Sequence, residues 1–252
     1  MNVIGLIGLP GAGKTTACEA LEESDFDVEI IQMKYVAKQC YDAVNENGLG
    51  GFSEEFQSKI EQDNDAEERF CVSGDFAEEI ADWVDRVLEV EGDYFASRAV
   101  ERAEKSTSDY CVVDGIRSTA DATTFRDTAD NCVFYFLHCP FETRLTRLQD
   151  RSREGEEDMN ATNLLERDRQ ELSWGLRAIL SSYTYSEHNE ERTVEPDFPI
   201  EYIPAMNSSV EEFQRNIRYS FSDTISEWEY SLKNALLTKV LSLYNHLTSV
   251  WS

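Results

Sequence analysis

Lysine is scarce in this chain of 252 residues: seven lysines stand among 23 basic residues, against 50 aspartates and glutamates. A formal charge of −27 repels phosphate backbones and anionic membranes, so we expect neither nucleic acid nor a membrane as partner. The Debye length falls to about 3 Å in 1 M salt, so a salt-rich cytoplasm would screen such a surface. The acids are spread over the whole chain, which favours a halophilic protein over a locally acidic one in ordinary cytosol.

Paired cysteines and long apolar runs are also missing. The six cysteines include no C-x-x-C pair, so neither a disulfide framework nor a zinc site is indicated. The most apolar late stretch, residues 236–251, is interrupted by Lys239, Asn245 and His246 and is not expected to span a bilayer. The first strand pattern starts at the N-terminus and leaves no room for a signal peptide. We therefore expect a cytoplasmic protein.

The most informative stretch is a complete G-x-x-x-x-G-K-[ST] motif. It consists of Gly8, Leu9, Pro10, Gly11, Ala12, Gly13, Lys14 and Thr15, and Thr16 follows it. An apolar strand pattern precedes the motif and a helical pattern follows, so a chance glycine–lysine turn is a poor alternative. Such a loop turns backbone N–H groups and a helix N-terminus toward phosphates. Lys14 can reach the β- and γ-phosphates, and Thr15 can ligate Mg²⁺, which predicts nucleoside triphosphate binding.

Five apolar runs, at residues 3–7, 28–31, 110–113, 132–137 and 200–203, are typical of buried parallel strands. Helical patterns fall between them and predict an α/β P-loop NTPase with a doubly wound, parallel, five-stranded sheet. Between the second and third runs the apolar residues recur at helical spacing, which predicts a helical insertion at about residues 41–106. A polar stretch predicts a lid at about residues 149–162.

The C-terminal part is predicted to be helical. We expect a long helix at about residues 162–181, and Ser209 with Glu212 forms a capping-box pattern that opens another helix. We assign residues 1–220 to the nucleotide kinase-like domain and residues 221–252 to an amphipathic C-terminal helix. That helix either docks on its own domain or forms a contact in a homo-oligomer.

An acidic residue ends the third strand pattern, where Asp114 is followed by Gly115. A phosphate-loop enzyme needs an acid at this position to hold Mg²⁺ directly or through water. The alternative is an ordinary aspartate in a strand-end turn. Arg117 lies three residues further and can face a bound anion, or it forms a surface ion pair.

A second arginine cluster contains Arg144, Arg147, Arg151 and Arg153. Phosphoryl transfer needs fixed positive charge on the transferring group, supplied when a lid closes. We favour this role for Arg147 and Arg153, with pairing to nearby acids such as Asp150 as the alternative. Arg167 and Arg169 can contribute from the following helix. The chain has no N-K-x-D motif, which argues against a regulatory GTPase.

Four segments, at residues 8–16, 112–118, 138–151 and 166–175, resemble a family of archaeal, and from the charge haloarchaeal, P-loop kinase-like proteins. That family is similar to adenylate kinases and dephospho-CoA kinases. The resemblance covers residues 1–40 and 108–218. It implies ATP on the phosphate loop with Asn207 beside the adenine ring, a substrate-binding insertion and an arginine-bearing lid. Residues 114–117 resemble the region that contacts metal and substrate phosphate in nucleotide kinases.

One residue departs from this pattern: Tyr35 stands where the resemblance implies an acid after the second strand. A phosphate acceptor is already anionic and needs no general base, so a nucleotide-like acceptor fits better than a hydroxyl. We therefore predict an ATP- and Mg²⁺-dependent small-molecule kinase in which Lys14, Arg117, Arg147 and Arg153 are catalytic. The alternative is an ATP-binding switch or adaptor that hydrolyses slowly and acts through a protein partner. The net charge disfavours a third option, a nucleic-acid end kinase.

Overall fold

The computed structural model describes residues 1–72, 76–151, 159–179, 200–205 and 209–250. The chain divides into two compact units, Met1–Asn207 and Ser208–Ser252. The boundary that the sequence analysis predicts, at residue 221, lies after the start of the second unit. The first unit contains the sheet and the helical insertion, and it holds the candidate site.

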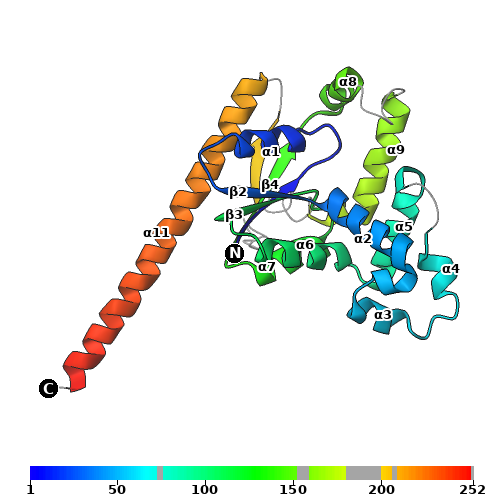
Figure 1. Cartoon of the computed structure of the whole chain (residues 1–252). Helices are drawn as coiled ribbons and strands as arrows, with labels where there is room; N and C mark the ends of the chain where they lie inside the picture. The colour runs from blue at the N-terminus through cyan, green and yellow to red at the C-terminus, as the bar shows by residue number, and fades with distance from the viewer. Residues whose placement is uncertain (73–75, 152–158, 180–199, 206–208, 251–252) are drawn as a thin grey trace, which may run out of the picture. The chain divides into compact units, whose positions relative to one another are not determined.

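Five parallel strands form one sheet in the order β2-β3-β1-β4-β5 (Figure 1). They are β1 (Asn2–Ile7), β2 (Val28–Gln32), β3 (Tyr110–Asp114), β4 (Asn131–His138) and β5 (Ile200–Pro204). The central strand β1 is almost wholly buried, as its β-branched and apolar residues predict. The predicted doubly wound, five-stranded parallel sheet is therefore confirmed.

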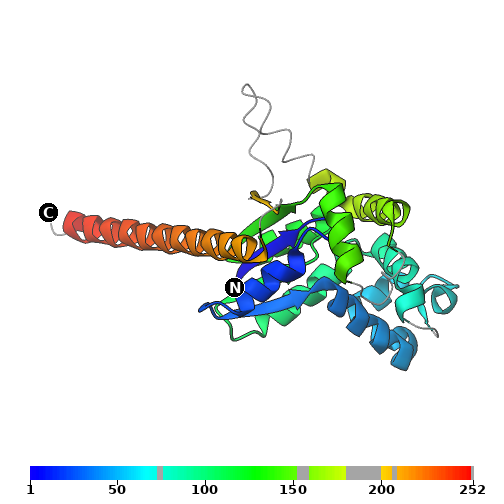
Figure 2. The ribbon, with the colours of Figure 1, turned by 90° about the horizontal axis from the view of Figure 1, so that it is seen from above.

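Helices cover both faces of this sheet (Figure 1). Helix α1 (Lys14–Glu22) lies on one face and turns small side chains inward, among them Ala17 and Ala20. Helices α6 (Tyr94–Glu104) and α7 (Thr119–Thr128) lie on the opposite face, as the view in Figure 2 also shows. In open parallel sheets with helices on both faces, ligands bind at the carboxyl ends of the strands.

The insertion between β2 and β3 is helical, as predicted. It contains α2 (Met33–Asn47), η1 (Gly48–Gly51), α3 (Glu54–Ile60), α4 (Ala66–Phe70), α5 (Phe76–Val90) and α6. Its centre is aromatic: the Phe52 ring stacks on Phe56 at 4.4 Å and on Trp83 at 5.9 Å between centroids. The Trp83 indole N–H donates to the Phe70 carbonyl oxygen at 2.9 Å. Because these side chains are buried, the insertion is a packed part of the main core.

The elements after β4 differ in detail from the prediction. They are α8 (Phe141–Arg151), α9 (Ala161–Glu171), the π-helical turn η2 (Leu172–Leu176), β5, and α11 (Val210–Val250). The helix expected at 162–181 is broken at η2, where Gly175 has a φ of 119°. The Glu212 N–H donates to the Ser209 hydroxyl, as the capping pattern predicts. Helix α11 then continues without a break, so the two helices expected there are one.

Candidate functional site

The phosphate loop connects β1 to α1 at the carboxyl end of the central strand. Gly11 has a φ of 78°, and a Cβ there would lie 3.0 Å from the Arg144 carbonyl oxygen, so only glycine fits. Gly13 is the N-cap of α1. Because glycine has no side chain, no side-chain hydrogen bond caps the first turn of this helix. The N–H groups of that turn, which include Thr15 and Thr16, therefore face the loop without a side-chain cap and suit an anion.

Lys14, the first residue of α1, folds back into this loop. Its ammonium donates to the carbonyl oxygen of Gly8 and, at 3.4 Å, to that of Leu9. Burial lowers the pKa of Lys14, and the carboxylates of Glu171 and Asp114 oppose that shift. The loop thus contains a partly buried cation that two carboxylates attract.

Asp114 ends β3, paired in register with Leu6 of β1 and with Gln32 of β2. Its Oδ1 is buried and has no hydrogen-bond partner among the described residues. Burial raises the pKa of Asp114, while Lys14 and Arg117 act to lower it. A buried carboxylate oxygen without a partner is costly and suits a cation.

A magnesium ion fits this arrangement. Asp114 has a carboxylate oxygen without a hydrogen-bond partner, and Thr15 has a hydroxyl group in the first turn of α1. Among the described residues, no group of three or more histidines, cysteines, aspartates or glutamates is arranged to hold a metal ion. Magnesium sites in phosphate-loop proteins take their remaining ligands from phosphates and water.

Arg117 lies beside the same site and is held on two sides. Its guanidinium is 3.6 Å from the Glu171 carboxylate and stacks over the Trp174 ring at 4.7 Å from the centroid. The backbone N–H groups of Arg117 and Ser118 both donate to the buried Asp121 carboxylate, which fixes the loop after β3. Arg117 therefore forms an ion pair, which was one of its two alternatives, and it interacts electrostatically with Lys14 and Asp114. Its role toward a bound anion stays a prediction.

Arg144 has a different place from the other arginines of its cluster. It is buried, and its guanidinium donates to both carboxylate oxygens of Asp168, at 2.8 and 2.6 Å. It also donates to the carbonyl oxygens of Pro10, at 3.0 Å, and Cys139, at 3.2 Å. Arg144 thus ties α8 and α9 to the phosphate loop.

The remaining predicted residues are spread more widely. Arg147 is half-buried and donates to the Ala205 carbonyl oxygen at 3.0 Å and to the Cys139 sulfur at 3.3 Å. Arg151, Arg167 and Arg169 are exposed. Arg153 and Asn207, predicted for the lid and the adenine ring, lie outside the described residues. Tyr35, in the first turn of α2, is 54% exposed.

Glu171 is the residue that the sequence reasoning missed. Its side chain is 13% exposed and, at the end of α9, lies close to Arg117 and interacts with Lys14 and Asp114. It belongs to the resembling segment 166–175, but no local pattern marked it. The π turn that follows brings Gly175 against Ser118, so the segment that carries Glu171 packs on the loop after β3.

The fold and the loop define a P-loop protein with a kinase-like α/β architecture. A family model described as "AAA domain" matches residues 4–169. A UPF0200 protein of Methanosarcina acetivorans is 30% identical over 179 residues, covering 70% of this chain and 79% of the relative. A UPF0200 protein of Methanosarcina barkeri is 29% identical over 193 residues, covering 75% and 87%. The chain belongs to the AAA-domain family and, more narrowly, to the UPF0200 family known from archaea.

Solved structures resemble the chain at low identity. The crystal structure of TT1252 from Thermus thermophilus has a TM-score of 0.47 at 12% identity, covering 88% of this chain and 97% of that chain. A gluconokinase from Sinorhizobium meliloti has a TM-score of 0.43 at 13% identity, covering 91% and 97%. Among the described residues, no helix is both long and apolar enough to cross a membrane.

Proposed function

We propose that this protein is an ATP- and Mg²⁺-dependent small-molecule kinase of the nucleotide-kinase type. It transfers the γ-phosphoryl group of ATP to a nucleotide-like acceptor that carries a phosphate. The observation that supports this most is the meeting of Lys14, Asp114 and Arg117 at the carboxyl ends of β1 and β3. A phosphate loop, an acid for the metal and a fixed arginine are the parts that phosphoryl transfer needs.

Each group has a role that follows from its position. The loop amides of residues 8–16 and Lys14 would hold the β- and γ-phosphates, in place of the carbonyl oxygens that Lys14 now contacts. Thr15 and Asp114 would hold Mg²⁺, which when bound neutralises charge that develops on the phosphates. Arg117 would orient the acceptor phosphate, since its guanidinium is fixed beside the loop by Trp174.

Arg147 and Arg153 would cover the transferring phosphoryl group, and Asn207 would lie beside the adenine ring. For that role Arg147 must first leave the Ala205 carbonyl oxygen and the Cys139 sulfur. The exposed Tyr35 leaves no acid at the start of α2 to act as a general base. An acceptor that is already anionic does not require one.

The test is ATP consumption with Mg²⁺ in molar KCl, followed by phosphorus NMR. Reactions are run with and without a panel of nucleoside monophosphates and dephospho-CoA. A new phosphorylated product that appears with one acceptor supports the kinase and identifies its substrate. ATP consumption that no acceptor changes contradicts it.

The matched control compares two lysine substitutions. Lys14→Ala removes the ammonium from the loop and is expected to abolish turnover while the far-UV circular dichroism spectrum stays unchanged. Lys38→Ala removes a half-exposed lysine that pairs with Asp42 on α2, and it should leave turnover unchanged. Full activity of Lys14→Ala would contradict the proposed mechanism.

An ATP-binding switch is the second candidate function, favoured by the exposed tyrosine at position 35 where a kinase of hydroxyl acceptors needs an acid. In that case ATP would be bound tightly and hydrolysed slowly without any acceptor. A change of oligomeric state between the ATP and ADP forms, measured by sedimentation velocity, would mark this function.

A further inference from the structure

A pocket of about 340 Å³ lies in the helical insertion, between α2, the loop after η1 and α6. No residue of the phosphate loop lines it, and neither Asp114 nor Arg117 does. Helix α6, which forms one wall, covers the face of the sheet opposite to α1 (Figure 1). The pocket is therefore separate from the proposed triphosphate site.

Two arginines one helical turn apart, Arg98 and Arg102 of α6, line this pocket together with the exposed Gln39 of α2. None of the lining residues is an aspartate or glutamate, although the chain contains 50 acids in 252 residues. In so acidic a protein, a cavity that has two guanidinium groups and no carboxylate has the polarity to hold an anion.

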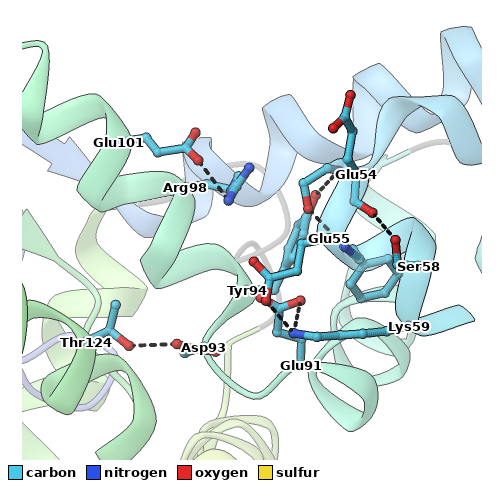
Figure 3. A network of polar contacts seen from close by, with 12 residues as sticks. Glu54, Glu55, Ser58, Lys59, Glu91, Asp93, Tyr94, Arg98, Glu101 and Thr124 are labelled. Carbon is cyan, nitrogen blue, oxygen red and sulfur yellow. Dashed lines mark hydrogen bonds and ion pairs between the residues drawn. The ribbon is translucent and has the colours of Figure 1, made fainter.

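Arg98 is held in place before any ligand binds. Its guanidinium lies over the Tyr94 ring at 5.5 Å from the centroid, and one terminal nitrogen is 2.8 Å from the Glu101 carboxylate (Figure 3). Its Nε is buried and has no hydrogen-bond partner among the described residues. A buried donor without an acceptor costs free energy, which a ligand oxygen at this point would recover.

Arg102 is anchored in the same way from the other side. Its Nε donates to the Glu29 carboxylate of β2 at 2.9 Å, which leaves its two terminal nitrogens for other acceptors. Each arginine is thus fixed by one glutamate that does not line the pocket. Side chains already held in their binding position lose little conformational entropy when a ligand arrives.

Most of the rest of the wall is apolar, with the hydroxyl groups of Ser53 and Tyr94 as exceptions. Gly51 packs so closely on α2 that a Cβ there would lie 2.4 Å from the Ala43 carbonyl oxygen, so a larger residue would push the wall away. Phe52 is fixed by stacking on Phe56 and Trp83. Burial raises the pKa of the Cys40 thiol to about 11, so this wall is uncharged at neutral pH. An apolar floor with a few polar groups at one side is typical of small-molecule sites.

We propose that this pocket binds a small organic anion, whose phosphate or carboxylate group lies between Arg98 and Arg102 and whose carbon skeleton lies against Phe52. Guanidinium groups suit both kinds of anion because they donate two parallel hydrogen bonds. The proposal does not rest on the kinase activity, because the pocket shares no residue with the site for that function.

Binding is measured by isothermal titration calorimetry with glycerol 3-phosphate and glycerate as probes. The phosphate loop is filled beforehand with Mg²⁺ and a non-hydrolysable ATP analogue, and the titrations are repeated with Lys14→Ala. Binding of either probe under both conditions supports a second site, and the probe that binds more tightly identifies the preferred anion. Absence of binding by both probes overturns the proposal.

Two variants locate the bound probe. The pair Arg98→Gln with Arg102→Gln removes both guanidinium groups, and Gln39→Trp covers the pocket from an exposed position without changing the charge. Each should weaken binding at least tenfold. The control pair Arg69→Gln with Arg126→Gln makes the same charge change at two ion-paired arginines that do not line the pocket. Equal affinity in the pocket variants and the control pair overturns the assignment to this pocket.

Discussion

The guanidinium of Arg144 and the carboxylate of Asp168 form a buried pair, with both nitrogens of one facing both oxygens of the other at 2.8 and 2.6 Å. The side chains are only 4% and 8% exposed. Since Arg144 also donates to the Pro10 carbonyl oxygen, the pair couples the position of α9 to the shape of the phosphate loop. The opposite charges compensate one another only while both are present.

Asp168→Asn is therefore expected to be strongly destabilising, because it leaves the Arg144 charge buried without a counter-charge. Removal of one partner of a buried ion pair costs about 3–5 kcal/mol. We expect a loss of that size in the free energy of unfolding, measured by denaturant titration of the circular dichroism signal. Asp150→Asn, on the exposed side of α8, is the matched control and should change stability by less than about 0.5 kcal/mol. Equal effects of the two substitutions would mean that the pair contributes no more than a surface charge.

The position of Glu171 leads to a second prediction, about nucleotide affinity. Its carboxylate lies beside Arg117 and close to Lys14, so it opposes the entry of a triphosphate into the same region. Glu171→Gln should bind ATP more tightly, by roughly fivefold, which is about 1 kcal/mol, the size of a like-charge interaction at about 4 Å in a solvent of water-like dielectric constant. The gain should be smaller for ADP, which lacks the γ-phosphate.

Affinities for both nucleotides are measured by calorimetry, with Glu166→Gln as the control. Glu166 is exposed on the same helix, so its substitution makes the same charge change away from the loop. Weaker ATP binding by Glu171→Gln would contradict the prediction and would indicate that Glu171 mainly keeps Arg117 in position.

The sheet, the phosphate loop and Asp114 could be predicted from sequence because each depends on local patterns. An apolar run that ends in Asp-Gly indicates a buried strand, and it also indicates that the aspartate lies at the carboxyl end of that strand. Glu171 could not be predicted in this way. It lies near the loop at the end of α9, where the π turn also brings Gly175 against Ser118, and such tertiary contacts have no signal in the neighbouring residues.

The arginine cluster also shows that local patterns do not predict the contacts a side chain makes with distant parts of the chain. The spacing of Arg144, Arg147 and Arg151 places them on one helical face, and that much follows from the sequence. Whether an arginine on that face is buried depends on a counter-charge elsewhere. Asp168 lies 24 residues after Arg144 and is brought to it by the turn back into α9. The pattern therefore indicated positive charge near the loop, but not that Arg144 supports the loop from within.

The buried carboxylate of Asp114 leads to a prediction about pH. Burial raises its pKa in the folded protein, so over the range between its ordinary value and the raised value the folded protein holds a proton that the unfolded chain has lost. Stability contributed by this group therefore falls as the pH rises through that range, and the loss persists at neutral pH. Asp114→Asn cannot ionise, so without Mg²⁺ it should be more stable than the natural protein at pH 7.

The comparison is made by denaturant titration in Mg²⁺-free buffer at pH 7 and at about pH 4, near the ordinary pKa of aspartate. The advantage of Asp114→Asn should shrink at the lower pH. The same variant should lose the extra stability that Mg²⁺ with ATP gives to the natural protein, because stabilisation by a ligand depends on its affinity. A variant that is less stable at pH 7 would show that attraction by Lys14 and Arg117 outweighs the cost of burial.

The last prediction concerns helix α11, which runs from Val210 to Val250 without a break and, at 1.5 Å per residue, is about 60 Å long. In the sequence of its second half, apolar residues recur at helical spacing and form an apolar stripe along the helix. Burying such a stripe against another protein surface removes it from water and is favourable. We expect the stripe to mediate self-association of the protein.

Sedimentation velocity over a range of concentrations should then show an oligomer. Leu236→Lys with Leu243→Lys, on the stripe, should dissociate it, whereas Asn234→Lys with Asn245→Lys adds the same charge on the opposite side and should not. A sedimentation coefficient that is independent of concentration and identical for the two variants would contradict self-association through this helix and would favour its docking within one chain.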